Sequence, residues 1–190
     1  MTQVRAENLA AALARGVPPL VWIHGDEPLL VQEAAHAVRQ ALRASGFDER
    51  QVFDGGRGFR AEAFVAEASA LSLFASRRLI ELRLPGKPNR EIGQMLADAA
   101  AQASEDTRLL VSGPRLDRAT TESAWFAAVD RAGLIVPIWP VERAQLPQWI
   151  AARLARQKQR ADRDTLELIA ERVEGNLLAA PQELGKLGLL

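Results

Sequence analysis

One short apolar run near the start of the chain constrains the fold more than any other feature. Leu20-Val-Trp-Ile23 contains no polar residue, which is typical of a strand whose sheet is covered by helices on both faces. Asp26 then offers a helix N-cap oxygen, and Pro28 suits a first helical turn. A helix is predicted from there to Gly46, since an apolar residue recurs at every fourth position. These residues are Leu30, Ala34, Val38 and Leu42.

The same alternation of apolar run and helical pattern continues through the next hundred residues. Further strands are predicted at residues 51–53, 79–84, 108–111 and 134–138. Helical patterns lie between them, at residues 61–71, 90–103 and 121–131. Five strands that alternate with helices predict an α/β domain over residues 1–139, with a mostly parallel sheet and helices on both faces.

The pattern changes after Pro140, because no further strand is indicated. Three helices are predicted instead, at residues 147–157, 164–174 and 177–189. Gly175 is placed to end the second of these in a left-handed turn, whereas Pro181 weakens the third. Residues 140–190 are therefore expected to form a small three-helix lid domain. An α/β domain followed by a helical lid resembles the AAA+ layout.

Composition excludes several classes of function. Lys plus Arg and Asp plus Glu both number 24, so the chain has no overall positive field that would attract nucleic acid. Cysteine is absent, which excludes disulfides, thiolate nucleophiles and zinc–thiolate sites. No apolar run is long enough to span a membrane, and the N-terminus lacks the pattern of a signal peptide. The expected location is the cytoplasm, with no membrane partner.

The turn after the first strand has the position of a phosphate-binding loop but not its chemistry. Such a loop needs G-x-x-x-x-G-K-[ST], because backbone N–H groups surround the phosphates, the lysine neutralises charge and the hydroxyl binds magnesium. Counted from Gly25, the last three key positions hold Leu30, Val31 and Gln32. Two acidic residues beside Gly25 would also repel a triphosphate. We expect no ATP hydrolysis, no cofactor and no metal site.

Other polar patterns give weaker indications. Gly55-Gly-Arg-Gly58 could hold a phosphate but is more simply a flexible turn, and His24 and His36 are more simply structural than catalytic. No spacing of carboxylates indicates an acid–base pair. A basic cluster near the first lid turn either contacts DNA phosphates or forms a solvated helix face. It comprises Arg153, Arg156, Lys158, Arg160 and Arg163.

Bulky apolar residues gather where the helix over residues 61–71 runs out. Before them, Phe64, Val65 and Ala68 recur at helical spacing and are expected to face the core. The three that follow fan around more than one face, so some of them should be exposed; they are Leu71, Leu73 and Phe74. An exposed Leu–Phe pair is a candidate protein-docking site, since large side chains fill a partner's pocket. The alternative is that the pair covers the core beneath a loop.

An ordered set of segments adds to this interpretation. They are Gly25-Asp-Glu-Pro-Leu-Leu30, Leu71-Ser-Leu-Phe-Ala-Ser-Arg77, Ala124-Trp-Phe126, Gln145-Leu-Pro-Gln-Trp-Ile-Ala-Ala-Arg153 and Glu174-Gly-Asn-Leu-Leu178. Together they resemble the delta-subunit family of the bacterial DNA polymerase III clamp loader. The resemblance implies an AAA+-like fold that is not itself an ATPase. It also implies that Leu71, Leu73 and Phe74 insert into a hydrophobic pocket of the sliding clamp.

The resemblance further implies partners and a mechanical role. ATP binding in other loader subunits would expose the docking element, its insertion would favour an open clamp, and DNA would be met through the loader complex. The family carries a third, helical collar domain after the lid. Because the sequence ends at Leu190, inside a helical pattern, a shortened lid and no collar domain are expected.

Two alternatives from other classes remain open. An active P-loop ATPase would bind nucleotide despite its missing lysine, which a nucleotide titration would detect. A DNA-binding module would use the basic cluster, and its DNA affinity would depend strongly on salt.

Overall fold

The computed structural model describes residues 3–69 and 77–187, which form two compact units. The first unit contains residues up to 26 together with residues 30–138. The second contains residues 27–29 and residues from 139 onward.

The first unit is built on a five-stranded sheet in which every pair of neighbouring strands is parallel. Its strands are β1 (Leu20–Gly25), β2 (Phe47–Asp54), β3 (Arg77–Arg83), β4 (Thr107–Gly113) and β5 (Gly133–Ile138). They lie in the order β2-β3-β4-β1-β5. Leu20 is in register with Leu109 of β4 on one side and with Gly133 of β5 on the other. The predicted α/β class is therefore confirmed.

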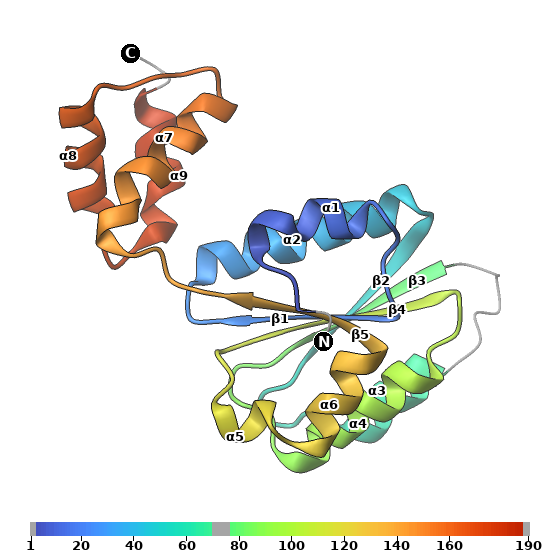
Figure 1. Ribbon diagram of the computed structural model, residues 1–190. Helices are drawn as coiled ribbons and strands as arrows, with labels where there is room; N and C mark the ends of the chain where they lie inside the picture. Colours follow the sequence, from blue (N-terminus) through green and yellow to red (C-terminus); the bar gives the residue numbers. More distant parts are fainter. Residues whose placement is uncertain (1–2, 70–76, 188–190) are drawn as a thin grey trace. The chain divides into compact units, whose positions relative to one another are not determined.

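Helices cover both faces of this sheet (Figure 1). One face carries α1 (Leu9–Leu13) and α2 (Pro28–Ala44). The other carries α3 (Ala61–Ser69), α4 (Arg90–Gln102), α5 (Arg118–Thr121) and α6 (Ala124–Ala132). All residues of β1 are buried, because Val21 and Ile23 pack with α1 and α2 while Leu20 and Trp22 pack on the opposite face. This is the arrangement that the uninterrupted apolar run predicts.

Aromatic rings fill the core on the α4–α6 side. Trp22 stacks on Trp125 with ring centroids 5.7 Å apart, and Phe126 lies 6.2 Å from Trp22. Gly93 in α4 lies directly against the Trp125 ring, where a Cβ atom would overlap it. Trp125 and Phe126 are therefore core residues, as expected from the sequence.

Two elements differ from the sequence-based prediction. The second strand is longer, Phe47–Asp54 instead of residues 51–53. It is an edge strand with a mostly exposed surface, so its first half needs no apolar pattern. The helix predicted over residues 121–131 is two helices, because the Ser123 hydroxyl accepts a hydrogen bond from the Phe126 N–H and starts α6 afresh. The short helices before β1 were not predicted, since their alanine-rich sequence gives little periodicity; they are the 3-10 helix η1 (Ala6–Asn8) and α1.

The second unit is helical. It comprises η2 (Arg143–Gln145), α7 (Leu146–Arg156), α8 (Arg163–Val173), η3 (Leu177–Ala179) and α9 (Ala180–Leu187). Ile150 and Val173 are fully buried in its core. Gly175 has φ +74°, which confirms the predicted left-handed turn after α8. Pro181 is the second residue of α9, where its missing N–H breaks no helical hydrogen bond, so it does not weaken this helix as the sequence suggested.

Candidate functional site

The predicted docking residues Leu71, Leu73 and Phe74 lie outside the residues that the structure describes. The described chain reaches Ser69 at the end of α3 and resumes at Arg77, the first residue of β3. The site can therefore be built only from what flanks it.

The helix that leads into the segment is anchored in the core by one face. Phe64 and Ala68 are buried, four residues apart. Phe64 contacts Phe53 of β2 edge-on, with 5.4 Å between ring centroids. Val65 was expected to face the core as well, but its side chain is 39% exposed. One residue along a helix is a rotation of about 100°, which carries Val65 away from the stripe formed by Phe64 and Ala68.

An arginine joins the two ends of the docking segment. Arg78, in β3, is a buried cation: its side chain is only 8% exposed. Its Nη1 lies 2.9 Å from the Glu67 carboxylate, and its Nη2 donates to the Glu67 backbone carbonyl at 2.8 Å. Because Glu67 belongs to the last turn of α3, this double contact fixes the exit of the segment beside its entry.

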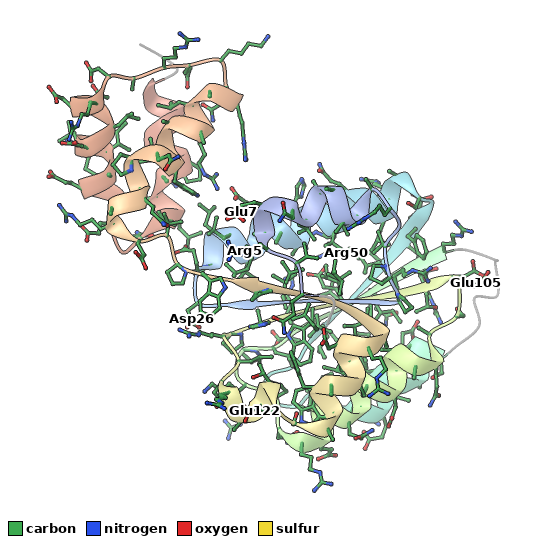
Figure 2. The ribbon with its side chains drawn as sticks, viewed as in Figure 1. Arg5, Glu7, Asp26, Arg50, Glu105 and Glu122 are labelled. Atoms are coloured by element: carbon green, nitrogen blue, oxygen red, sulfur yellow. The ribbon has the colours of Figure 1, made fainter. Side chains whose placement is uncertain are left out.

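Two more arginines support the amino-terminal ends of the strands, the edge at which Glu105 is labelled in Figure 2. Arg77 lies 3.4 Å from Asp106 and donates to the Ser45 carbonyl at 3.1 Å. Arg108 donates to the Val17 carbonyl at 3.0 Å, and both guanidinium groups lie over the Phe47 ring. The base of the docking segment is thus held by backbone and ring contacts.

The carboxyl-terminal edge of the sheet, where Asp26 is labelled in Figure 2, carries the altered phosphate-binding turn. Only two residues separate the end of β1 at Gly25 from the start of α2 at Pro28. Pro28 has no N–H to offer a phosphate. Gly25 has a packing role, because a Cβ atom there would overlap the backbone of Ile138 in β5. Neither the backbone nor the side chains of this turn match the requirements of a phosphate-binding loop.

The loop after β4 makes the polar contacts of this edge. The Arg115 N–H donates to the Asp26 carboxylate at 3.1 Å, and the Leu116 N–H donates to His24 Nδ1 at 3.5 Å. Burial, with a smaller contribution from the charge of Arg115, lowers the pKa of His24 to about 4. His24 is therefore neutral near pH 7 and accepts a hydrogen bond, which is the structural role expected for it.

The glycine-rich segment after β2 forms a turn. The Gly56 N–H donates to the Asp54 carboxylate at 2.9 Å, and Gly58 has φ +88°. A carboxylate thus already accepts the hydrogen bond that an anion would need, so the turn interpretation is supported.

The basic cluster of the second unit divides into two kinds of side chain. Arg153 stacks over Trp149 at 3.9 Å, and Arg163 forms an ion pair with Glu167 at 2.8 Å. The side chains of Arg156, Lys158 and Arg160 have no ion-pair or hydrogen-bond partner among the described residues. Only these three remain available for phosphate contacts.

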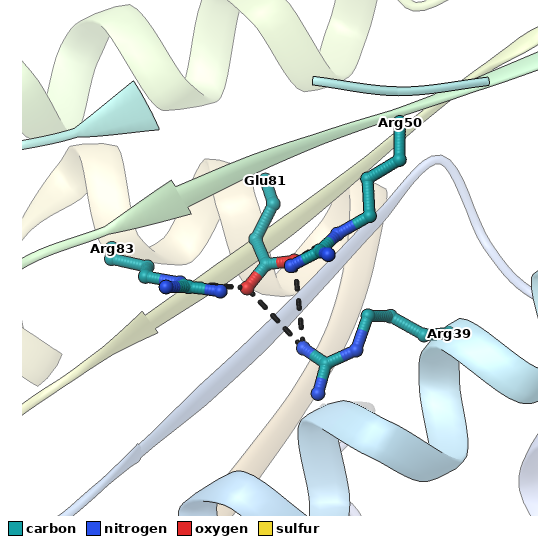
Figure 3. Close-up of polar contacts among 4 residues, drawn as sticks. All are labelled: Arg39, Arg50, Glu81 and Arg83. Carbon is teal, nitrogen blue, oxygen red and sulfur yellow. Dashed lines mark hydrogen bonds and ion pairs between the residues drawn. The ribbon is translucent and has the colours of Figure 1, made fainter. Parts of the chain in front are cut away.

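One cluster was missed from the sequence. Glu81 in β3 is buried, and three arginines bind its carboxylate (Figure 3). Arg50 of β2 approaches to 2.7 Å, Arg83 of β3 to 3.0 Å and Arg39 of α2 to 3.3 Å. Burial by itself raises the pKa of Glu81, but hydrogen bonds from Arg50 and Arg83 and the charges of Arg50 and Arg39 outweigh it and hold the pKa below its ordinary value. The available signal was the single acid inside Leu79-Ile-Glu-Leu82, since a buried carboxylate requires a cationic partner.

Within residues 3–69 and 77–187, no group of three or more His, Cys, Asp or Glu side chains could hold a metal ion. No helix in the same ranges is long and apolar enough to cross a membrane.

Comparison with known proteins gives the chain its family. The family model described as "DNA polymerase III, delta subunit" matches residues 22–138. DNA polymerase III subunit delta of Escherichia coli is 36% identical over 191 residues, and that of Haemophilus influenzae is 23% identical over 193 residues. Both alignments cover 100% of this chain and 56% of the relative, so the chain spans about half the length of these curated relatives.

Solved structures agree on the fold. The Bacillus subtilis DNA clamp loader delta protein matches with a TM-score of 0.68 at 18% identity, over 96% of this chain and 56% of that one. A Thermotoga maritima RuvB variant matches with a TM-score of 0.57 at 18% identity, over 95% of this chain and 58% of the other. The fold is AAA+-like. With the family model matching most of the first unit, the chain belongs to the DNA polymerase III delta-subunit family.

Proposed function

We propose that this chain is the clamp-binding part of a clamp-loader delta subunit, which acts in the cytoplasm during DNA replication and hydrolyses no ATP itself. Membership of the delta-subunit family, over residues 22–138, carries this proposal. In the proposal, Leu71, Leu73 and Phe74 enter a hydrophobic pocket of the sliding clamp and favour its open form. The full-length subunit contacts the other loader subunits, and meets DNA through the loader complex. We further propose that residues 1–139 form the clamp-binding domain and residues 140–190 a lid domain.

The flanks of the docking segment support a positioned docking element. The Arg78–Glu67 contact holds both ends together, and the buried Phe64 and Ala68 fix the last turns of α3. A short segment with fixed ends loses less conformational entropy on binding than a free peptide. Burial of a Leu and a Phe in a partner pocket would contribute about 1.5–3 kcal/mol each.

Selective binding makes such an element mechanical. A ligand shifts a conformational equilibrium only by the difference between its affinities for the two states. The docking element must therefore bind the open clamp more tightly than the closed one.

The test is a clamp-binding measurement on the double variant Leu73→Ala/Phe74→Ala. We expect a fall in affinity of at least a hundredfold, about 3 kcal/mol, with little change in the free energy of unfolding. Val65→Ala is the matched control, since it also truncates an exposed apolar side chain but lies on α3. The proposal fails if the double variant binds the clamp as wild type does. It also fails if clamp binding is lost only in proportion to unfolding, since the pair would then be part of the core, where each truncation costs about 2–5 kcal/mol.

A DNA-binding function has one observation in its favour, the three unpartnered cations Arg156, Lys158 and Arg160 described above. Replacing all three with Ala should then weaken DNA binding and lower its salt dependence, by about one counterion for each phosphate that the variant can no longer neutralise. The same variant should bind the clamp normally.

A further inference from the structure

The three arginines around Glu81 carry more charge than the carboxylate can neutralise. Three guanidinium groups and one carboxylate leave a surplus of two positive charges in the four-residue cluster. Asp54 is in register with Arg83 on the same side of the sheet, but its Oδ1 accepts the Gly56 N–H and it forms no ion pair with Arg83. An internal salt bridge needs one arginine, so the cluster has binding capacity left over.

The arginines are exposed, whereas the carboxylate beneath them is not. The Glu81 side chain is 2% exposed, compared with 26% for Arg39, 40% for Arg50 and 55% for Arg83. Beyond these contacts to Glu81, their side-chain N–H groups have no partner among the described residues, and an arginine has five donors. The unused donors are therefore open to solvent, while a buried acid fixes the groups that carry them.

The fold explains why this place is open. Arg50 and Glu81 lie on the side of the sheet that α2 covers, but β2 is an edge strand and its surface here is exposed. Val52, in register with Glu81, is 43% exposed. The arginines thus come from three elements, α2, β2 and β3, and meet beside an uncovered strip of sheet (Figure 3).

We propose that Arg39, Arg50 and Arg83 form a binding site for a phosphate group, with Glu81 as the positioning residue. A phosphate monoester carries a charge of about −1.5 to −2 at pH 7, which matches the surplus of two. Its tetrahedral oxygens accept hydrogen bonds from guanidinium groups that approach from different directions. A second carboxylate, with one charge and two coplanar oxygens, would leave one arginine unsatisfied. This site goes beyond the proposed clamp binding and does not depend on it.

The probes are inorganic phosphate and two single-stranded DNA oligonucleotides of one sequence, with and without a 5′-phosphate. Binding to the chain is measured by calorimetry for the oligonucleotides and by competition for inorganic phosphate. Preference for the phosphorylated end identifies a terminal phosphate as the ligand, whereas equal binding identifies the phosphodiester backbone. Either result supports the proposal if it depends on the three arginines.

Variants test that dependence. Arg50→Ala and Arg83→Ala should each weaken phosphate-dependent binding about tenfold, because each removes a charge-assisted hydrogen bond. Arg50→Lys should restore only part of it, since lysine keeps the charge but loses the paired donors. Glu81→Gln should tighten binding, because the surplus rises to three charges; if that variant does not fold, the exposed Arg83 carries the test alone. Arg131→Ala on α6 is the matched control and should bind as wild type does.

Two outcomes overturn the proposal. The first is wild-type binding that inorganic phosphate does not compete with or that Arg50→Ala and Arg83→Ala leave unchanged. The second is tighter binding of an acidic peptide than of either oligonucleotide, which would make the cluster a protein-docking site. Clamp binding is measured on the same variants and should be unchanged, so failure of this site is distinguishable from failure of the proposed function.

Discussion

His24 should make the stability of the first unit depend on pH in a range where few other groups titrate. The side chain is 7% exposed, and its pKa is lowered from 6.5 to about 4. In the unfolded chain the imidazole takes up a proton as the pH falls through 6.5, whereas in the folded chain it stays neutral until about pH 4. The unfolded state therefore binds more protons between these values, and the free energy of unfolding falls as the pH is lowered.

The expected size follows from the two pKa values. A separation of about 2.5 units corresponds to about 3 kcal/mol when fully developed. Between pH 7 and pH 5, the loss should be about 2 kcal/mol. For a chain of this length, that corresponds to a fall in melting temperature of about 4–8 °C. Protonation would also remove the acceptor on Nδ1 for the Leu116 N–H.

Urea denaturation followed by circular dichroism at pH 7, 6 and 5 measures this directly. His24→Gln should abolish most of the pH dependence, because glutamine does not titrate. His36→Gln is the matched control: His36 is the only other histidine in the sequence and is exposed on α2, so its variant should keep the wild-type dependence. A flat wild-type profile between pH 7 and pH 5, or an equal loss in His24→Gln, would refute the reasoning.

Two further predictions concern buried contacts. Glu81→Gln should lower the free energy of unfolding at pH 7 by about 1–3 kcal/mol, because three guanidinium groups lose their common counter-charge. Since the folded pKa of Glu81 is depressed, this contribution is present above pH 4.5 and is lost as the pH falls below it, so the gap between the two proteins in urea titrations should narrow in acid; a constant gap would contradict this. Gly93→Ala should destabilise by about 1–3 kcal/mol through overlap with Trp125, although the same change in an open helix stabilises. Gly185→Ala in α9 is the control, because no atom lies within 4 Å of its added Cβ; it should be neutral or stabilising, and equal effects at the two sites would exclude the overlap as the cause.

Local patterning determined much of the first unit. The uninterrupted Leu20–Ile23 predicted a strand covered on both faces, and alternation with helical patterns predicted the parallel sheet. Both follow from the periodicity of side chains along helices and strands, which is a property of the sequence itself. The missing lysine and hydroxyl of the phosphate-binding turn are likewise a matter of residue identity. The docking function of Leu71, Leu73 and Phe74 rests on family resemblance and stays a prediction.

Tertiary structure alone decided which distant side chains meet. Glu81 gains partners from positions 39, 50 and 83, and neither α2 nor β2 announces in its own sequence that it lies beside β3. Likewise, the low pKa of His24 depends on burial and on the loop after β4. The strand order β2-β3-β4-β1-β5 brings these groups together. Periodicity fixes which side of its own element a residue occupies, whereas charge pairing and burial depend on which elements become neighbours, and that is set by packing of the whole domain.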